Sequence, residues 1–247
     1  MFPLTEAGGK VVGFAGRLLD PEVKEAKYVN TPETQVYHKS ELLYGLSVTR
    51  GVIKQQDQAV VVEGELDLIS SWQVGVKNMV AIKGSAFTEG QIRLVSRYTQ
   101  KVRLALDADS AGQEATRRSI ALADNLGMSV RIVEIKGGKD PDEIAQEDPK
   151  KWREMVAQAI GVYDWYVSSA MRRWEVATGE GKRGASLELA PILAGISNGV
   201  EQAHYVKLVA EKLDVSEDAV WGEVRKAQLG TTEKTVEKGR GEKAEKS

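Results

Sequence analysis

Carboxylates follow three predicted strands of the chain, at the point where each strand ends. Short apolar runs at 59–62, 102–106 and 130–135 have the composition of strands buried in a parallel sheet, and helical patterns separate them. Because ligands of open α/β sheets bind outside the carboxyl ends of the strands, we expect the acidic side chains to gather at one edge. These side chains are Glu63, Asp67, Asp107, Asp109, Asp140 and Asp142.

Carboxylates gathered in this way indicate a divalent metal site. Like charges repel one another unless they share a cation, and carboxylate oxygens are the hard ligands that suit Mg²⁺ (or Mn²⁺). Each piece also has a simpler interpretation, since an Asp-x-Asp pair is commonly a helix N-cap and Glu63-Gly64 a strand terminator. The repetition of strand, acid and helix at three strand ends favours the metal site.

Several basic residues lie in loop-like surroundings that suit phosphate contacts. Arg17, Lys27 and Lys39 are of this kind, with Tyr28 and Asn30 as neighbours. Taken alone they are typical of ordinary surface cations. Lys83 follows the predicted strand 79–82 at the acidic edge, and the pattern leaves open whether it contacts phosphate or only solvent.

Composition excludes several classes of protein. The 247 residues are 42% hydrophobic with a net charge of −2, which permits a large core but does not predict nucleic-acid binding. The absence of cysteine excludes disulfides and Cys-based zinc sites, so we expect no zinc. No apolar run could span a bilayer, no signal-peptide pattern is present, and no G-x-x-x-x-G-K-[ST] loop occurs. The pattern predicts a soluble, cytoplasmic protein without membrane contact.

The order of elements predicts an α/β protein, a parallel sheet flanked by helices, with a small mixed β/loop segment before it and a helical subdomain after it. We expect the divisions 1–50, 51–148, 149–230 and a disordered charged tail at 231–247. The first segment should contain a hairpin of residues 1–4 and 10–18 and a short helix closing at 42–46. The predicted sheet region has helices at 66–73, 89–98 and 113–126, the second with Thr88 and Gln91 in a capping box.

The region after Pro149 is predicted to be helical, with helices at 151–160, 163–178, 187–198, 202–213 and 217–228. Ser186 and Ser216 should cap the third and fifth of these helices. The glycine-rich residues 179–184 predict a flexible loop. The tryptophans at 152, 165, 174 and 221 are expected to pack between helices and not to stack on bases.

The acidic motifs resemble a known family. Glu63-Gly64-x-x-Asp67, Asp107-x-Asp109 and Asp140-Pro141-Asp142-Glu143 look like a Toprim domain, the fold shared by bacterial primases, type IA and II topoisomerases, OLD-family nucleases and recombination-mediator proteins. Flanking residues, over about 1–147, resemble the catalytic core of the bacterial replicative DNA primase. They are Met1-Phe2-Pro3, Gly13-Phe14-Ala15-Gly16-Arg17, Lys27-Tyr28-Val29-Asn30-Thr31-Pro32-Glu33-Thr34, His38-Lys39 and Leu43-Tyr44-Gly45-Leu46.

This resemblance implies an enzyme that makes short RNA primers on single-stranded DNA from ribonucleoside triphosphates, by two-metal nucleotidyl transfer within the replication machinery. Glu63, Asp107 and Asp109 would be the catalytic metal ligands, with Asp67, Asp140 and Asp142 lining the same site, although Glu63 could instead be a general base. The resemblance implies nucleotide or template binding by Arg17, Lys27, Tyr28, Asn30, Lys39 and Lys83. A replicative helicase would be the partner of the full-length protein.

The sequence also departs from the family pattern. Glu65 stands where the family usually has an aromatic residue, and the loop 82–86 differs from the usual version. The family's zinc ribbon and basic subdomain are not found, and no helicase-binding domain follows the charged tail. Two alternatives therefore stay open: a non-catalytic Toprim piece that needs another chain for activity, and a Toprim nuclease or topoisomerase.

Overall fold

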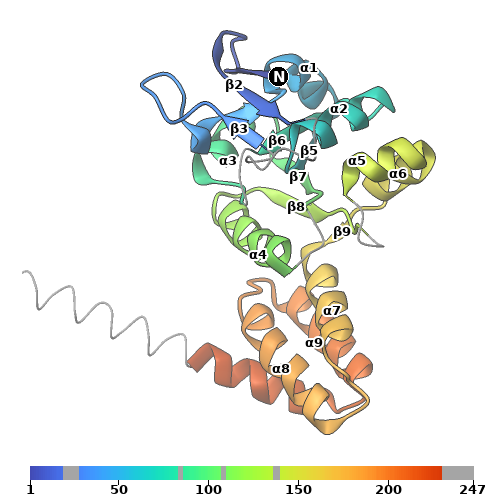
Figure 1. Ribbon diagram of the computed structural model, residues 1–247. Coiled ribbons are helices and arrows are strands. Elements are labelled where there is room, and N and C mark those ends of the chain that lie inside the picture. The colour runs from blue at the N-terminus through green and yellow to red at the C-terminus, as the bar shows by residue number, and fades with distance from the viewer. Residues whose placement is uncertain (19–27, 83–85, 107–109, 136–139, 230–247) are drawn as a thin grey trace, which may run out of the picture. The chain divides into compact units, whose positions relative to one another are not determined.

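The computed structural model describes residues 1–18, 28–82, 86–106, 110–135 and 140–229 (Figure 1). The chain divides into two compact units, Met1–Val162 and Tyr163–Ser247. The first unit holds the sheets and the second is helical over its described residues, so the α/β fold predicted from the sequence is confirmed. The predicted disordered tail lies outside the described residues.

The first unit begins with a three-stranded antiparallel sheet of β1 (Phe2–Thr5), β2 (Val11–Arg17) and β3 (Tyr28–Asn30). The predicted hairpin is confirmed, because β1 pairs with β2 and the connecting Gly9 has a φ of 97°. Leu4 and Ala15 from this sheet form a small core with Tyr37 and Leu42. Through this core the segment 37–42, which leads to the larger sheet, packs against the three-stranded sheet.

The larger sheet has six strands in the order β4–β6–β5–β7–β8–β9. Its four inner strands are parallel, and β4 and β9 are antiparallel to their neighbours at the two edges. All residues of β5 and β6 are buried and apolar, which is why their bounds could be predicted to the residue. The strands are β4 (Leu43–Tyr44), β5 (Ala59–Val62), β6 (Met79–Ile82), β7 (Lys101–Leu104), β8 (Ser129–Ile132) and β9 (Ile160–Gly161).

Helices pack on the sheet and connect its parallel strands (Figure 1). The main apolar core joins the sheet to α2, α5 and α6, with Trp152 of α6 fully buried in it. On other parts of the sheet α1 packs against β6, and α3 packs against α4. The helices are α1 (Leu46–Gln56), α2 (Glu65–Gln73), α3 (Glu89–Val95), α4 (Ser110–Asn125), α5 (Pro141–Glu147) and α6 (Pro149–Ala157).

The predicted short helix at 42–46 is wrong. Leu43 and Tyr44 form edge strand β4, paired with Ile82 and Ala81, and a helix begins only at Leu46. Gly45 is the N-cap of that helix, with a φ of 82°, and a Cβ added there would lie 2.6 Å from Leu68 Cδ1. The glycine therefore marks a strand-to-helix turn against α2, not the end of a helix.

The second unit contains α7 (Val162–Arg173, beginning one residue earlier), α8 (Gly179–Ala194), α9 (Gly199–Leu213) and a helical segment at 217–229. Ser216 accepts a hydrogen bond from the Ala219 N–H, as predicted for a cap. The predicted loop at 179–184 is wrong, because these residues form the first turns of α8 with Thr178 as N-cap. Ser186 consequently lies inside the helix.

Close packing explains two of the three glycines of α8, Gly181 and Gly184. A Cβ at Gly181 would lie 2.0 Å from the Glu175 carbonyl oxygen, and one at Gly184 would lie 2.3 Å from the Trp174 ring. The Trp174 indole also donates to Glu188, whose carboxylate pairs with Arg173. Among helices within the described residues, none is both long and apolar enough to cross a bilayer.

Candidate active site at the carboxyl edge of the sheet

The strand order places a topological switch point between β5 and β7. The chain leaves β5 towards β6 on one side, and then crosses to β7 on the other side before continuing to β8. The crevice beyond the carboxyl ends of two such strands is where open α/β sheets bind ligands. Here Glu63 directly follows β5, and Asp107 is three residues after the last residue of β7.

The register of β5 and β7 brings the two acidic sequences to the same level of the sheet. Val61 pairs with Leu104, and the Ala105 N–H donates to the Val61 carbonyl at 2.8 Å. Continuing this register sets Glu63 opposite Leu106, one residue before Asp107. Asp107 and Asp109 themselves lie outside the described residues, so their approach to the half-buried Glu63 stays a prediction.

Asp67, which was predicted to line the metal site, ties two helices together at this edge. Its carboxylate accepts hydrogen bonds from the Gly64 N–H at 2.9 Å and from the Asp142 N–H at 3.2 Å. The side chain is 8% exposed and lies in the first turn of α2, where a negative charge is favoured by the helix dipole. The α2 and α5 N-termini therefore share one buried carboxylate.

The two acids of the third cluster have separate local partners. Asp142 accepts a short hydrogen bond from the Ser70 hydroxyl and another, of 2.6 Å, from the Gln146 amide. Asp140 is the N-cap of α5 and accepts from the Glu143 N–H at 2.8 Å. The structure thus brings Asp142 to Asp67, while Asp140 has the capping geometry that is the simpler interpretation of an acid before a helix.

The carboxylates of the described residues do not by themselves complete a metal site. Within the ranges that the structure describes, no group of three or more acidic or histidine side chains lies close enough to hold an ion. The donor set is nevertheless all carboxylate, which is the chemistry that Mg²⁺ prefers. The metal site therefore depends on Asp107 and Asp109 joining Glu63 and stays a prediction.

Three of the predicted nucleotide- or template-binding residues come together on the small sheet. The Cα of Arg17 pairs with that of Tyr28, and Ala15 pairs with Asn30, so Arg17 and Asn30 lie on the same face. Only the main chain of Tyr28 is described, and Lys27 and Lys83 lie outside the described residues. The binding role of all six stays a prediction.

Lys39 begins the short 3-10 turn η1 (Lys39–Glu41), and its side chain is exposed. Four residues later the chain enters β4, where Leu43 pairs with Ile82, the last residue of β6. Since β4 runs antiparallel to β6, the residues before Leu43 lie beyond the carboxyl edge of the sheet. Lys39 therefore lies on the same side of the sheet as Glu63.

Glu65 is a buried carboxylate beside two tyrosines, and sequence reasoning did not foresee those partners. It is 5% exposed at the start of α2. Burial raises the pKa of the Tyr37 hydroxyl, and the charges of Glu33 and Glu65 raise it further. Burial and then Glu65 likewise raise the pKa of Tyr44. Burial and the nearby carboxylates thus favour the protonated hydroxyl of both tyrosines.

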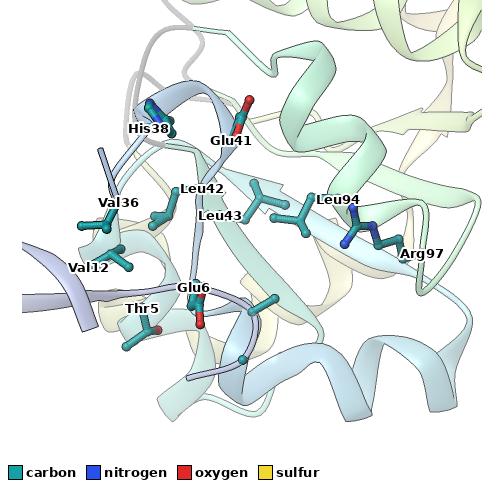
Figure 2. Close-up of a pocket in the computed structure, with 12 residues that line it drawn as sticks. Thr5, Glu6, Val12, Val36, His38, Glu41, Leu42, Leu43, Leu94 and Arg97 are labelled. Carbon is teal, nitrogen blue, oxygen red and sulfur yellow. The ribbon is translucent and has the colours of Figure 1, made fainter. Parts of the chain in front are cut away.

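A pocket with a volume of about 370 Å³ lies in the first unit and is lined in part by residues on both sides of Lys39 (Figure 2). It is formed by the β1–β2 turn, the segment 36–43 and the C-terminal part of α3, and it includes Val12, Leu94 and Arg97. None of the predicted site residues lines it. The pocket therefore shares the segment around Lys39 with the candidate site but contains none of its predicted ligands.

Comparison with protein families agrees with this architecture. Residues 60–145 match a model described as Toprim-like, and residues 1–50 match the N-terminal domain of the DNA primase catalytic core. Residues 163–218 match the model described as the DnaB-helicase binding domain of primase. The class defined by fold and motifs is thus a Toprim-like α/β domain with a primase-type sheet before it and a helical part after it.

Individual relatives lead to the same family. A DNA primase of Clostridium acetobutylicum is 34% identical over 224 residues, which is 90% of this chain and 37% of that protein. A DNA primase domain from Pseudomonas aeruginosa superposes with a TM-score of 0.70 at 30% identity, covering 91% of this chain and 71% of that one. A primase catalytic domain bound to single-stranded DNA superposes with a TM-score of 0.70 at 27% identity over 89% of this chain. The chain belongs to the bacterial replicative DNA primase family, and it spans about a third of the length of the curated relatives it matches.

Proposed function

We propose that this chain is the nucleotidyl-transferring part of a DNA primase, which joins ribonucleoside triphosphates into a short RNA primer on single-stranded DNA. The observation that carries the proposal is the position of Glu63 at the carboxyl end of β5, beside the strand that leads to Asp107, at the switch point of the sheet. We take the reaction from the primase family and its location from the acidic residues at the carboxyl edge of the sheet.

In the proposed reaction the 3′-hydroxyl of the growing primer attacks the α-phosphorus of the incoming nucleotide. A bond forms between that oxygen and phosphorus, the bond to the bridging oxygen breaks, and pyrophosphate leaves. Glu63, Asp107 and Asp109 would hold a pair of Mg²⁺ ions, which supply neutralisation of phosphate charge and activation of the hydroxyl when bound. Glu63 either ligates a metal or accepts the proton of the hydroxyl.

The remaining residues of the proposed site act on binding. Lys39, exposed beyond the carboxyl edge, and Arg17 on the small sheet would hold the triphosphate or the template backbone. Asp67 keeps α2 and α5 together, so that the carboxylates of both helices face the same edge. Asp142 would then affect the metal site through this shared hydrogen bond.

The proposed partners follow from the relatives. A single-stranded DNA template is proposed because a superposable primase domain has been solved with single-stranded DNA. A replicative helicase is proposed because residues 163–218 match a helicase-binding model, and this match supports a contact through the residues of α7 to α9. This match favours a second, binding function for the chain.

The proposed function is tested by primer synthesis on single-stranded DNA with labelled ribonucleotides and Mg²⁺ or Mn²⁺. We expect labelled RNA with the parent and at least a hundredfold less with Asp107→Ala or Asp109→Ala, as for loss of a metal ligand. Full synthesis by either variant would overturn the site.

Two other outcomes separate the alternatives. Synthesis that appears only after the amino-terminal part of a related primase is added would indicate a non-catalytic piece that needs another chain. Cleavage of supercoiled plasmid without any primer synthesis would indicate a Toprim nuclease.

A further inference from the structure

The segment 33–42, which we call the Lys39 loop, is held by several hydrogen bonds between its own residues. The Glu33 carboxylate accepts from the Lys39 N–H at 2.8 Å and lies 3.2 Å from His38 Nδ1. Thr34 and Tyr37 also bond to each other twice, through the Thr34 N–H and the Thr34 hydroxyl. The Tyr37 ring, 1% exposed, anchors the middle of the loop in the small core.

Gln91 of α3 is the hub that joins this loop to the larger sheet. Its side-chain amide is 1% exposed and donates to the carbonyls of Lys39, at 3.2 Å, and Leu42, at 3.0 Å. Its side-chain oxygen accepts from the Thr88 N–H at 3.0 Å, which closes the capping box of α3. The Thr88 hydroxyl adds a bond to the Ser40 carbonyl. One buried amide thus serves a helix cap and a loop at the same time.

The consequence for Lys39 is a fixed main chain with an exposed side chain. Its N–H bonds to Glu33 and its carbonyl to Gln91, while its ammonium group makes no ion pair with any residue in the described ranges. Because the main chain is already held in place, only the side chain of Lys39 has to be ordered when it binds a phosphate. The loop lies beyond the carboxyl end of β6, the neighbour of β5, which Glu63 directly follows.

We infer that Gln91 is a positioning residue for phosphate binding: it holds the Lys39 loop so that Lys39 meets the triphosphate at the acidic edge. This inference rests on the proposed function for the role of Lys39. The clamp itself rests on the hydrogen bonds and burial of Gln91 and can be tested without nucleotide.

Gln91→Glu is the sharpest variant. Glutamate is a standard third residue of a capping box, so the bond from the Thr88 N–H and the start of α3 are retained. The two donated bonds to the loop are lost, because a carboxylate has no N–H. Gln100→Glu is the matched control, since Gln100 is exposed and follows the same helix, and its side-chain amide donates to the local Ser96 carbonyl and not to the Lys39 loop. Gln91→Met, which removes the same donors without adding charge, guards against an effect of the new carboxylate or a failure to fold.

The first measurement is amide hydrogen exchange of the 247-residue chain without nucleotide. We expect the Lys39 and Glu41 amides to exchange about tenfold faster in Gln91→Glu and Gln91→Met, the change expected for loss of one or two net hydrogen bonds. Exchange in Gln100→Glu should equal that of the parent. Unchanged exchange of these two amides in both Gln91 variants would overturn the inference, whatever the chain does with nucleotides.

The second measurement is a double-mutant cycle on binding of a fluorescent ribonucleoside triphosphate with Mg²⁺. Lys39→Ala and Gln91→Met should each weaken binding about tenfold, the factor that one charge-assisted hydrogen bond supplies. If Gln91 acts through Lys39, the double variant should bind as weakly as Lys39→Ala alone.

The outcomes separate the two claims. Additive losses would make Gln91 merely structural and would overturn the inference. Equal binding by the parent and Lys39→Ala would remove the role of Lys39 and with it the positioning role of Gln91. Failure of the parent to bind triphosphate at all would count against the proposed function, and the exchange measurement would still decide the clamp.

Discussion

Replacing Asp67 by asparagine tests whether this carboxylate is a structural tie between α2 and α5 as well as a neighbour of the metal site. The variant keeps the shape of the side chain and one acceptor oxygen. Its new NH₂ group must face either the Gly64 N–H or the Asp142 N–H, which are now 2.9 and 3.2 Å from the two carboxylate oxygens. One of the two bonds is therefore lost and replaced by a contact between two donors.

The expected cost follows from these contacts. A hydrogen bond to a charged group contributes about 1.5–3 kcal/mol, and the negative charge near two helix N-termini adds about 0.5 kcal/mol. We expect Asp67→Asn to lower the free energy of unfolding of the first unit by about 2–3 kcal/mol. This corresponds to a Tm lower by about 5–10 °C for a unit of this size.

The assay is urea and thermal unfolding in a chelator, so that no metal contributes. Asp140→Asn is the matched control, because Asp140 is exposed and makes one capping bond that asparagine can replace. It should change stability by less than about 0.5 kcal/mol. Asp67→Asn with parental stability in chelator would refute the tie between the helices, and a loss seen only with metal would make Asp67 a ligand and nothing more.

Three further predictions concern the turn at Gly45, the second unit and the metal. Gly45→Ala should destabilise the first unit by about 2 kcal/mol in urea unfolding, since alanine would need a positive φ there and its Cβ would meet Leu68. The control is Gly51→Ala in α1, where the added Cβ meets no atom and should stabilise the unit by about 0.5 kcal/mol. A Gly45→Ala variant with parental stability would contradict the strand-to-helix turn. Burial and Asp164 raise the pKa of Tyr205 to about 12. Its contribution to the stability of the second unit is therefore fully present below pH 10, the pKa of an unfolded tyrosine, and is lost as the pH rises through 12. In Tyr205→Phe the stability measured by circular dichroism should fall less over this pH range, and a pH profile equal to that of the parent would contradict the prediction. Mn²⁺ should raise the Tm of the parent and raise that of Asp107→Ala less; equal rises would show that the ion binds elsewhere.

The parts of the fold that the sequence predicts are those determined by neighbouring residues in the chain, such as apolar runs and helix caps. Strands β5 and β6 are runs of apolar residues buried on both faces, so composition alone located them. The Thr88 and Gln91 capping box is local and was also predicted correctly. The order of strands then implied a common edge for the acidic residues, and the observed switch point between β5 and β7 agrees with that expectation.

The wrong secondary-structure predictions fall where the local structure depends on contacts with a distant part of the chain. The local pattern predicts that Gly45 ends a helix, but in the structure Gly45 has a positive φ before a helix, and Leu68 of α2 leaves no room for a Cβ there. The glycines at 179–184 predict a flexible loop, because nothing local shows that Trp174 and Glu175 leave no room for a Cβ at Gly184 and Gly181. Short apolar runs such as 42–46 also fit a strand or a helix equally well by periodicity.

The candidate site shows the same limit. A motif can place Asp67 and Asp142 at one edge, but it cannot show that the Asp142 N–H bonds to the Asp67 carboxylate. Nor can it show that the Asp140 carboxylate caps α5, or that Gln91 bonds to a loop 52 residues earlier in the chain. These assignments depend on three-dimensional contacts between segments that are far apart in sequence.

Anomalous diffraction from a crystal soaked with Mn²⁺ tests most directly whether acids from neighbouring strands share one divalent ion. We predict a manganese peak ligated by carboxylate oxygens of Glu63 and of Asp107 or Asp109, at about 2.0–2.3 Å, beyond the ends of β5 and β7. A crystal in which manganese is absent from this edge, or in which Glu63 and Asp107 face away from each other, would contradict the account.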